Sequence, residues 1–176
     1  DDLVVYRLQG YYPIRVSTHA IERIISEAAG SGYIGDAFMF TYTLEGHKMV
    51  ALTFPSIPGV TTLEFDISQG LWHERESWDA GNNSLGRWRV NCAVPAYGKI
   101  LVGDAVSNQI GFMDWNVYTE YGTTIRGLAI TPPIDSYRKR VFISRCELDC
   151  EFGVGLASGQ GSDPQVAMDW SKDCGK

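Results

Sequence analysis

The chain has 176 residues, a hydrophobic share of 44%, a charged share of 20% and a formal net charge of −6. This length and balance predict a folded body with a core and exclude a disordered tail. The acidic excess argues against gripping nucleic acid by its phosphates, so we expect no direct sequence-specific binding of nucleic acid. No apolar run reaches the ~20 residues of a membrane span.

The first predicted element is one short helix near the N-terminus, over residues 18–29. Ser17 is the predicted N-cap and Gly30 the predicted end of this helix. His19 lies in the first turn, where we expect a surface or capping residue and not a catalytic base. Apolar residues recur at the i, i+3, i+4, i+7 spacing of an amphipathic helix: Ile21, Ile24, Ile25 and Ala28.

The remaining sequence predicts short strands separated by glycine-containing turns, and therefore an all-β fold class. The expected strands cover residues 37–43, 48–54, 61–66, 71–75, 87–94, 99–102, 109–113, 123–130 and 141–152. The last of these alternates apolar and charged residues, which is typical of a half-buried strand. Its Cys146 and Cys150 would lie on the apolar face ~13 Å apart, too far for a disulfide, so core packing is the favoured interpretation. Cys92 and Cys174 stand alone in the sequence, and we predict no metal site and no cofactor.

A weak internal repeat organises these strands. Residues 46–52 can be laid over residues 98–104 at an offset of 52, and residues 63–66 over residues 111–114 at an offset of 48. A period near fifty is typical of a four-stranded propeller blade, as in kelch repeats, and an apolar residue followed by Asp would end each third strand.

This repeat predicts that residues 1–176 form a single β-propeller-like segment. It would hold about three four-stranded blades, at about residues 37–78, 88–132 and 141–176. Because propellers have about four to eight blades, we expect the chain to be a fragment of a longer protein.

The last six residues match the start of an Asp box, the motif S-x-D-x-G-x-T-W. The matching positions are Ser171, Asp173 and Gly175. In this motif the Ser and Asp side chains bond the turn backbone and the Gly supplies a positive φ. We therefore predict a structural turn at a blade edge, with no catalytic role for Asp173.

Two longer runs of residues are more specific than these patterns. They are Gly70-Leu71-Trp72-His73-Glu74-Arg75 and Gly159-Gln160-Gly161-Ser162-Asp163-Pro164-Gln165-Val166. Shorter runs, among them Leu52-Thr53-Phe54-Pro55, lie in order with them over nearly the whole chain. Together they resemble the phage stabilisation family, the packaged-DNA stabilisation proteins or tail accessory factors of short-tailed bacteriophages.

The resemblance implies a non-enzymatic structural protein of the virion. Such a protein would sit in the tail below the portal, seal the portal channel after genome packaging, and connect the head to the tail needle and tailspikes. The implied partners are the portal or adaptor ring, the tail needle, the tailspike, and further copies of the chain in a ring. Assembly would take place in the cytoplasm of the bacterial host. No catalytic residue is implied.

Two alternatives stay open at this point. The first is an Asp-box propeller glycoside hydrolase of the sialidase kind, which needs convergent acidic groups, or a Tyr nucleophile with its acid, and substrate-holding Arg residues. No acidic residue has a spacing that singles it out for this role. The second is a carbohydrate- or protein-binding propeller. Its sugar platform would be drawn from Trp72, Trp78, Trp88 and Trp115, although core packing is the favoured interpretation of these residues.

Overall fold

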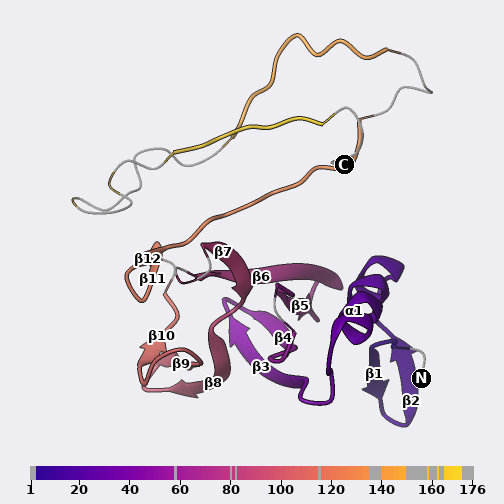
Figure 1. The fold of residues 1–176 in the computed structure, drawn as a ribbon, viewed down its shortest axis with the longest axis vertical. Coiled ribbons are helices and arrows are strands. Elements are labelled where there is room, and N and C mark those ends of the chain that lie inside the picture. Colours follow the sequence, from indigo (N-terminus) through magenta and orange to yellow (C-terminus); the bar gives the residue numbers. More distant parts are fainter. Residues whose placement is uncertain are drawn as a thin grey trace.

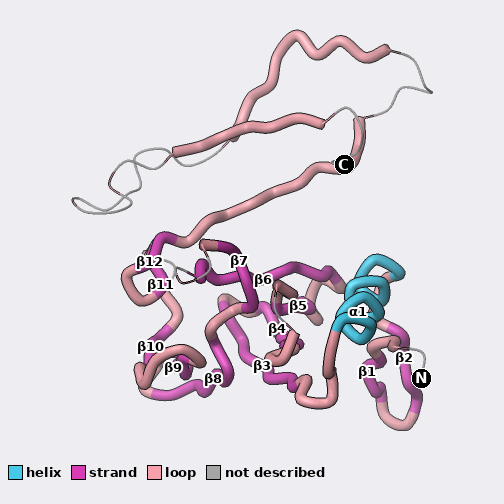
Figure 2. Tube along the Cα trace, viewed as in Figure 1, coloured by secondary structure: helices cyan, strands magenta, loops and turns pink. Residues whose placement is uncertain are grey.

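The computed structural model describes residues 3–57, 59–79, 81, 83–114, 116–134, 140–149, 158, 162 and 165–171. These residues form one helix, two antiparallel sheets and two further hairpins (Figures 1 and 2). The elements in chain order are β1 (Tyr6–Gln9), β2 (Tyr12–Arg15), α1 (His19–Ser31), β3 (Phe38–Leu44), β4 (His47–Thr53), β5 (Thr62–Asp66), β6 (Leu71–Asp79), β7 (Ser84–Arg87), β8 (Val90–Ala96), β9 (Lys99–Asp104), β10 (Ile110–Phe112), β11 (Thr119–Glu120) and β12 (Thr123–Thr124).

The larger sheet has five strands in the order β3-β4-β5-β6-β7, so each strand pairs with its neighbour in sequence. The smaller sheet has three strands in the order β10-β9-β8, and its strand β8 contacts β3 of the larger sheet. The remaining strands of the described residues form the two hairpins β1–β2 and β11–β12. Figure 1 shows α1 and the β1–β2 hairpin at one end of the body, with the smaller sheet at the other end. The predicted fold class, mostly β-structure with one short helix, is confirmed, and both sheets are open.

The helix begins one residue later than predicted and ends two residues later. Thr18, not Ser17, is the N-cap, and its hydroxyl accepts a hydrogen bond from the Ile21 amide. The Ser17 hydroxyl is already engaged, because it accepts from the Val5 amide and donates to Glu22. Gly32 is the C-cap. No helix in the described part of the chain is long and apolar enough to cross a membrane.

One face of the larger sheet is covered by the helix. The buried side chains of this cluster are Ile21, Ile25 and Ala28 from α1, Leu52 and Leu63 from the sheet, and Phe54 and Ile57 from the loop after β4. Leu63 is completely buried, and burying a side chain of this size contributes about 1.5–3 kcal/mol. The predicted stripe of apolar helix residues therefore does face the core.

The other face of the larger sheet packs against the smaller sheet. Its buried side chains are Tyr42 and Ala51 from the larger sheet, Val90 and Val102 from the smaller sheet, and Trp88 from the connection between them. Ala51 on β4 pairs with Glu64 on β5. Because cross-strand partners share a face of the sheet, Glu64 also lies on this face. The larger sheet is thus a middle layer with a helix on one side and a second sheet on the other.

The internal repeat is visible in the strands. Strands β8 and β9 begin 52 residues after β3 and β4, and β10 begins 48 residues after β5, as the sequence predicts. The turns match as well, because Glu45-Gly46 and Tyr97-Gly98 all have positive φ (48°, 84°, 54° and 71°), the geometry of a two-residue hairpin. Asp66 ends β5, and Met113-Asp114 directly follows β10.

The predicted strands beyond residue 124 are not formed in the described residues. Residues 125–134 and 140–149 run away from both sheets as an extended trace without strand pairing (Figures 1 and 2). A strand needs a hydrogen-bonded neighbour and a surface for its apolar side chains, and the described residues supply neither here. Cys146 is accordingly exposed, which corrects its predicted core packing, and Cys150 lies outside the described residues. The division into blade-like units at 37–78, 88–132 and 141–176 stays a prediction.

Candidate functional site

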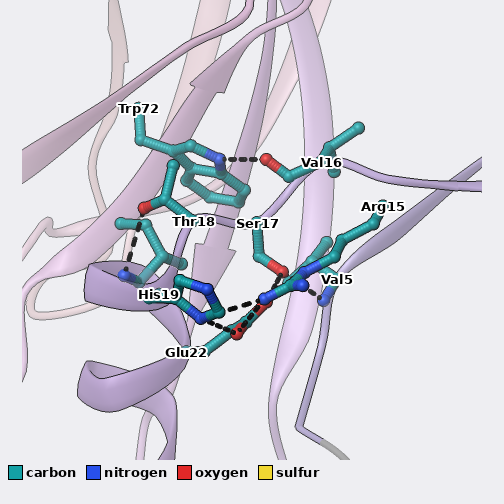
Figure 3. A network of polar contacts seen from close by, with 9 residues as sticks. Val5, Arg15, Val16, Ser17, Thr18, His19, Glu22 and Trp72 are labelled. Atoms are coloured by element: carbon teal, nitrogen blue, oxygen red, sulfur yellow. Dashed lines mark hydrogen bonds and ion pairs between the residues drawn. The ribbon is translucent and has the colours of Figure 1, made fainter.

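The junction between the N-terminal hairpin and the helix is held by a polar network (Figure 3). The Arg15 guanidinium donates to both carboxylate oxygens of Glu22, over 2.8 and 2.5 Å, and the Ser17 hydroxyl donates to the same carboxylate over 2.7 Å. These hydrogen bonds, with that from Arg15 the strongest, lower the pKa of Glu22 to about 2. His19 lies exposed beside them, with Nδ1 3.2 Å from Arg15.

A tryptophan ties this junction to the larger sheet. The indole N–H of Trp72 on β6 donates to the carbonyl oxygen of Val16 over 2.8 Å (Figure 3). Its ring packs against Phe65, with 5.0 Å between centroids. The predicted core packing of Trp72 is confirmed. Its hydrogen bond holds the backbone at Val16, two residues before the N-cap Thr18.

A second polar cluster is buried between the two sheets. The Tyr42 hydroxyl donates to the Glu64 carboxylate, and Arg75 donates to the Tyr42 oxygen over 2.6 Å and lies 3.5 Å from Glu64. The Arg75 guanidinium also lies over the ring of Trp88, 4.2 Å from its centroid. Burial raises the pKa of Tyr42, and the neighbouring Arg75 only partly opposes this.

This trio combines the residue types of a sialidase centre, a tyrosine, an acid and an arginine. A nucleophilic tyrosine must reach the substrate and lose its proton readily. Tyr42 is only 5% exposed and lies beside the Trp88 ring, Glu64 is only 4% exposed, and burial disfavours the tyrosinate. The arrangement is suited to holding β3, β5 and β6 of the larger sheet together and to packing against Trp88.

Two buried aspartates end strands and organise the turns that follow. Asp66 accepts from the amides of Ser68 and Gln69 and lies 2.7 Å from Nδ1 of His47. Burial opposes its ionisation, but these hydrogen bonds prevail and lower its pKa.

Asp104 ends β9 in the same manner. It forms two hydrogen bonds with Arg89, over 2.9 and 2.5 Å, and accepts from the amides of Val106 and Ser107. Its side chain is fully buried, and the Arg89 guanidinium holds the pKa of its carboxyl well below the usual range. The guanidinium also lies 4.8 Å from the ring centroid of Tyr121. The ion pair therefore connects β9 to the β11–β12 hairpin.

The β1–β2 hairpin is rich in exposed apolar and aromatic side chains on both of its faces and at its tip. Tyr11 at its tip is 99% exposed, Tyr12 78% and Leu8 71%. Behind the hairpin lies an apolar cavity of about 100 Å³. Its lining includes Val5, Val16, Val50 and Phe65. The hairpin thus exposes an aromatic surface at its tip.

The residues predicted for the Asp box are not tested by the structure. Ser171 is exposed, and Asp173 and Gly175 lie outside the described residues. The tryptophans do not form a platform in the described part of the chain. Trp72 and Trp88 pack on opposite faces of the larger sheet, Trp78 is 39% exposed, and Trp115 is outside the described residues. Among the described residues, no group of three or more His, Cys, Asp or Glu side chains could hold a metal ion.

The sequence analysis missed the Tyr42, Glu64 and Arg75 cluster. A signal was present, because Glu64 stands between the apolar residues Leu63 and Phe65 of a predicted strand. All five residues of β5 are buried, so an acid within it requires a partner. The partners Tyr42 and Arg75 are 22 and 11 residues away in sequence, and only the strand register brings them together.

Comparison with known proteins places this geometry in a family. A family model described as "Bacteriophage P22 Gp10, beta-propeller" matches residues 1–118, which is about two thirds of the chain. This range contains α1, both sheets and both polar clusters. No curated protein and no solved structure matches the chain.

Proposed function

Because the chain belongs to the phage stabilisation family, whose model is described as the β-propeller of bacteriophage P22 Gp10, we propose that it works as a tail adaptor of the virion. In this role it lies below the portal of a short-tailed bacteriophage and seals the portal channel after genome packaging. It connects the head to the tail needle and the tailspikes. Copies of the protein form a ring, and the particle is assembled in the cytoplasm of the bacterial host.

The observation that carries this proposal is the family match over the packed body. That body is a sheet packed on one side against α1 and on the other against a second sheet, with hydrogen-bonded charges where the β1–β2 hairpin meets α1 and on the sheet face that receives the second sheet. A plug that resists pressure from packaged DNA needs such a rigid scaffold. The chain has a net charge of −6, which does not favour binding to DNA phosphates. It fits a protein that retains DNA by blocking the exit of the channel.

The β1–β2 hairpin is the surface we assign to contact with a neighbouring virion protein. Tyrosines at an exposed tip supply large contact areas at a low entropy cost, and they are frequent interface hot spots. Tyr11 and Tyr12 have this placement. Binding at this surface comes from buried area and hydrogen bonds and involves no chemistry.

The test combines the purified protein with DNA-filled heads that lack it and, separately, with tail needles, and follows association and DNA content by sedimentation and electron microscopy. We expect binding below the portal and retention of packaged DNA. The double variant Y11D/Y12D should weaken binding about tenfold or more. The matched control is Y97D, at the tip of the β8–β9 hairpin, where Tyr97 is 94% exposed. Absence of the unaltered protein from both the portal and the needle would overturn the adaptor role.

We propose that the protein is not an enzyme. The buried Tyr42, Glu64 and Arg75 trio supports this, because its geometry serves packing. A glycan hydrolysis assay on the intact protein tests it, with Y42F as the comparison. Hydrolysis by the unaltered protein that Y42F abolishes would establish the sialidase-like alternative instead.

A further inference from the structure

A groove of about 730 Å³ lies between the tips of two hairpins, β3–β4 and β8–β9, and we call it the tip groove. One wall is formed by residues 43–45 of the larger sheet and the other by residues 95–100 of the smaller sheet. Residues 112–114 and 116 complete the lining. The volume lies within the ~300–1,000 Å³ of ligand-binding clefts, and the lining combines apolar side chains with a few charged ones, as such clefts do.

Two turn residues in the lining hold a backbone conformation that does not suit them. Glu45 and Tyr97 occupy the same position of equivalent hairpin turns, with φ of 48° and 54°. Asn, Asp or Gly is favoured at this position, because longer side chains crowd the backbone there.

A third hairpin shows what such a residue can gain. Tyr121, in the turn of β11–β12, has a φ of 47°, and its ring lies 4.8 Å from the Arg89 guanidinium. Within the described part of the chain, the side chains of Glu45 and Tyr97 form no hydrogen bond, ion pair or ring contact, and Tyr97 is 94% exposed. Both side chains are therefore available to a ligand, which is a reason for keeping them in strained positions.

A charge pair that is closed in the larger sheet is separated in the tip groove. Lys99 is equivalent to His47 at the offset of 52, and Asp114 is equivalent to Asp66 at the offset of 48. His47 and Asp66 lie 2.7 Å apart. Lys99 instead lies over the Phe112 ring, with Nζ 3.7 Å from the centroid. Asp114 uses Oδ1 within its own turn, and its Oδ2 bonds to no residue that the structure describes. The lining thus holds a separate ammonium donor and carboxylate acceptor.

The mixture of charges favours a neutral ligand. The carboxylates of Glu45 and Asp114 repel an anion, and the Lys99 ammonium repels a cation. A hydroxyl group can donate to a carboxylate and accept from an ammonium, so a neutral ligand with several hydroxyl groups satisfies both. The exposed ring of Tyr97 adds a flat apolar surface beside them.

We propose that the tip groove binds a neutral oligosaccharide. Its hydroxyl groups donate to Glu45 and Asp114 and accept from Lys99, while the C–H face of one sugar ring stacks on Tyr97. A groove of this size holds about two or three linked rings. The stacking surface is a tyrosine at a hairpin tip and not the tryptophan platform that the sequence suggested. This inference goes beyond the adaptor role, since it requires binding of a sugar and neither a virion partner nor cleavage.

A glycan array tests the proposal with the full chain. The array carries neutral oligosaccharides of hexoses and N-acetylhexosamines, with acidic oligosaccharides as a comparison. We expect saturable binding to neutral members, and calorimetry then gives the dissociation constant of the strongest one. This constant should change by less than about twofold between about 50 and about 500 mM NaCl, because a neutral ligand forms no ion pair for salt to screen.

Two substitutions separate binding from folding. E45N and Y97N each introduce the residue that the turn favours, so we expect both variants to be at least as stable as the unaltered chain. Each should weaken binding about tenfold, the first by loss of a charged acceptor and the second by loss of the stacked ring. The matched control is Y11N, which removes a 99% exposed tyrosine at the tip of the β1–β2 hairpin, outside the groove, and should bind as the unaltered chain does.

Three results would overturn the proposal. The first is that no neutral oligosaccharide on the array binds. The second is a preference for acidic oligosaccharides that disappears at about 500 mM NaCl, since this identifies recognition of charge. The third is binding that E45N and Y97N leave as strong as in Y11N, since this places the sugar outside the tip groove.

Discussion

The buried charge cluster between the two sheets can be tested by removing its cation. In the variant R75M the aliphatic stem remains, but the guanidinium that donates to Tyr42 and lies 3.5 Å from Glu64 is lost. The contact of Arg75 with the Trp88 ring is lost as well. The Glu64 side chain, which is 5% exposed, then keeps one donor, the Tyr42 hydroxyl.

The expected loss follows from burial. Removing one partner of a fully buried ion pair costs about 3–5 kcal/mol. The Arg75 side chain is 34% exposed, and solvent screening reduces this figure, so we expect R75M to lower the free energy of unfolding by about 2–3 kcal/mol. E64Q should lower it by about 2 kcal/mol, because Arg75 then lacks its anion.

The double variant R75M/E64Q distinguishes a true pair from two independent losses. Once the cation is absent, replacing the Glu64 carboxylate with a neutral amide removes the buried charge that would otherwise stay uncompensated. We therefore expect the double variant to lose at least about 1 kcal/mol less than the sum of the single losses. Urea denaturation followed by tryptophan fluorescence measures all four proteins.

The matched control is R126M, which removes an arginine 3.2 Å from Glu76 whose side chain is 57% exposed. Exposed ion pairs contribute about 0–1 kcal/mol, so R126M should change little. The reasoning is refuted if R75M also loses less than about 0.5 kcal/mol, or if the losses of R75M and E64Q simply add.

Two further predictions concern the helix and its core. Because Arg15 and Ser17 lower the pKa of Glu22 from 4.5 to about 2, the ionised carboxylate stabilises the fold above pH 4.5, and this stability is lost as the pH falls toward 2. E22Q should therefore melt at a lower temperature than the unaltered chain near pH 6, with the gap closing between pH 4.5 and 2 in a melting series; a gap independent of pH would contradict this reasoning. L63A should lower the free energy of unfolding by about 2–5 kcal/mol, because Leu63 is completely buried against the helix. L71A, at a 52% exposed leucine, should change it by less than about 1 kcal/mol in the same urea titration, and similar losses in the two variants would show that the helix-side core is poorly packed.

Local patterns predicted the parts of the fold that depend on near neighbours in sequence. The helix stripe, the strand alternation and the hairpin turns at Gly46 and Gly98 are such patterns, and the repeat offsets of 52 and 48 reappear in the strand positions. The prediction of Ser17 as N-cap was wrong, because the amide of Val5, which lies 12 residues before Ser17, donates to its hydroxyl oxygen.

The contacts that the sequence did not predict depend on the register of strands that lie far apart in the sequence. Tyr42, Glu64 and Arg75 come from β3, β5 and β6, and nothing in their spacing indicates that they meet. The alternation in residues 141–149 predicts a half-buried strand, but burial also requires a second surface. A pattern states which side of a strand is apolar and leaves open what covers that side.

The face of the larger sheet that packs on the smaller sheet and the equivalent face of the smaller sheet differ in chemistry. On the larger sheet this face carries Tyr42, Glu64 and Arg75, which bond to one another within that sheet. At the equivalent offsets of 52 and 48 the smaller sheet carries Val94 and Phe112. A buried polar network tolerates one arrangement of its partners, whereas an apolar face tolerates several. We therefore expect Tyr42, Glu64 and Arg75 to fix the register in which β3, β5 and β6 lie within the larger sheet, whereas Val94 and Phe112 leave the face of the smaller sheet able to pack in several ways.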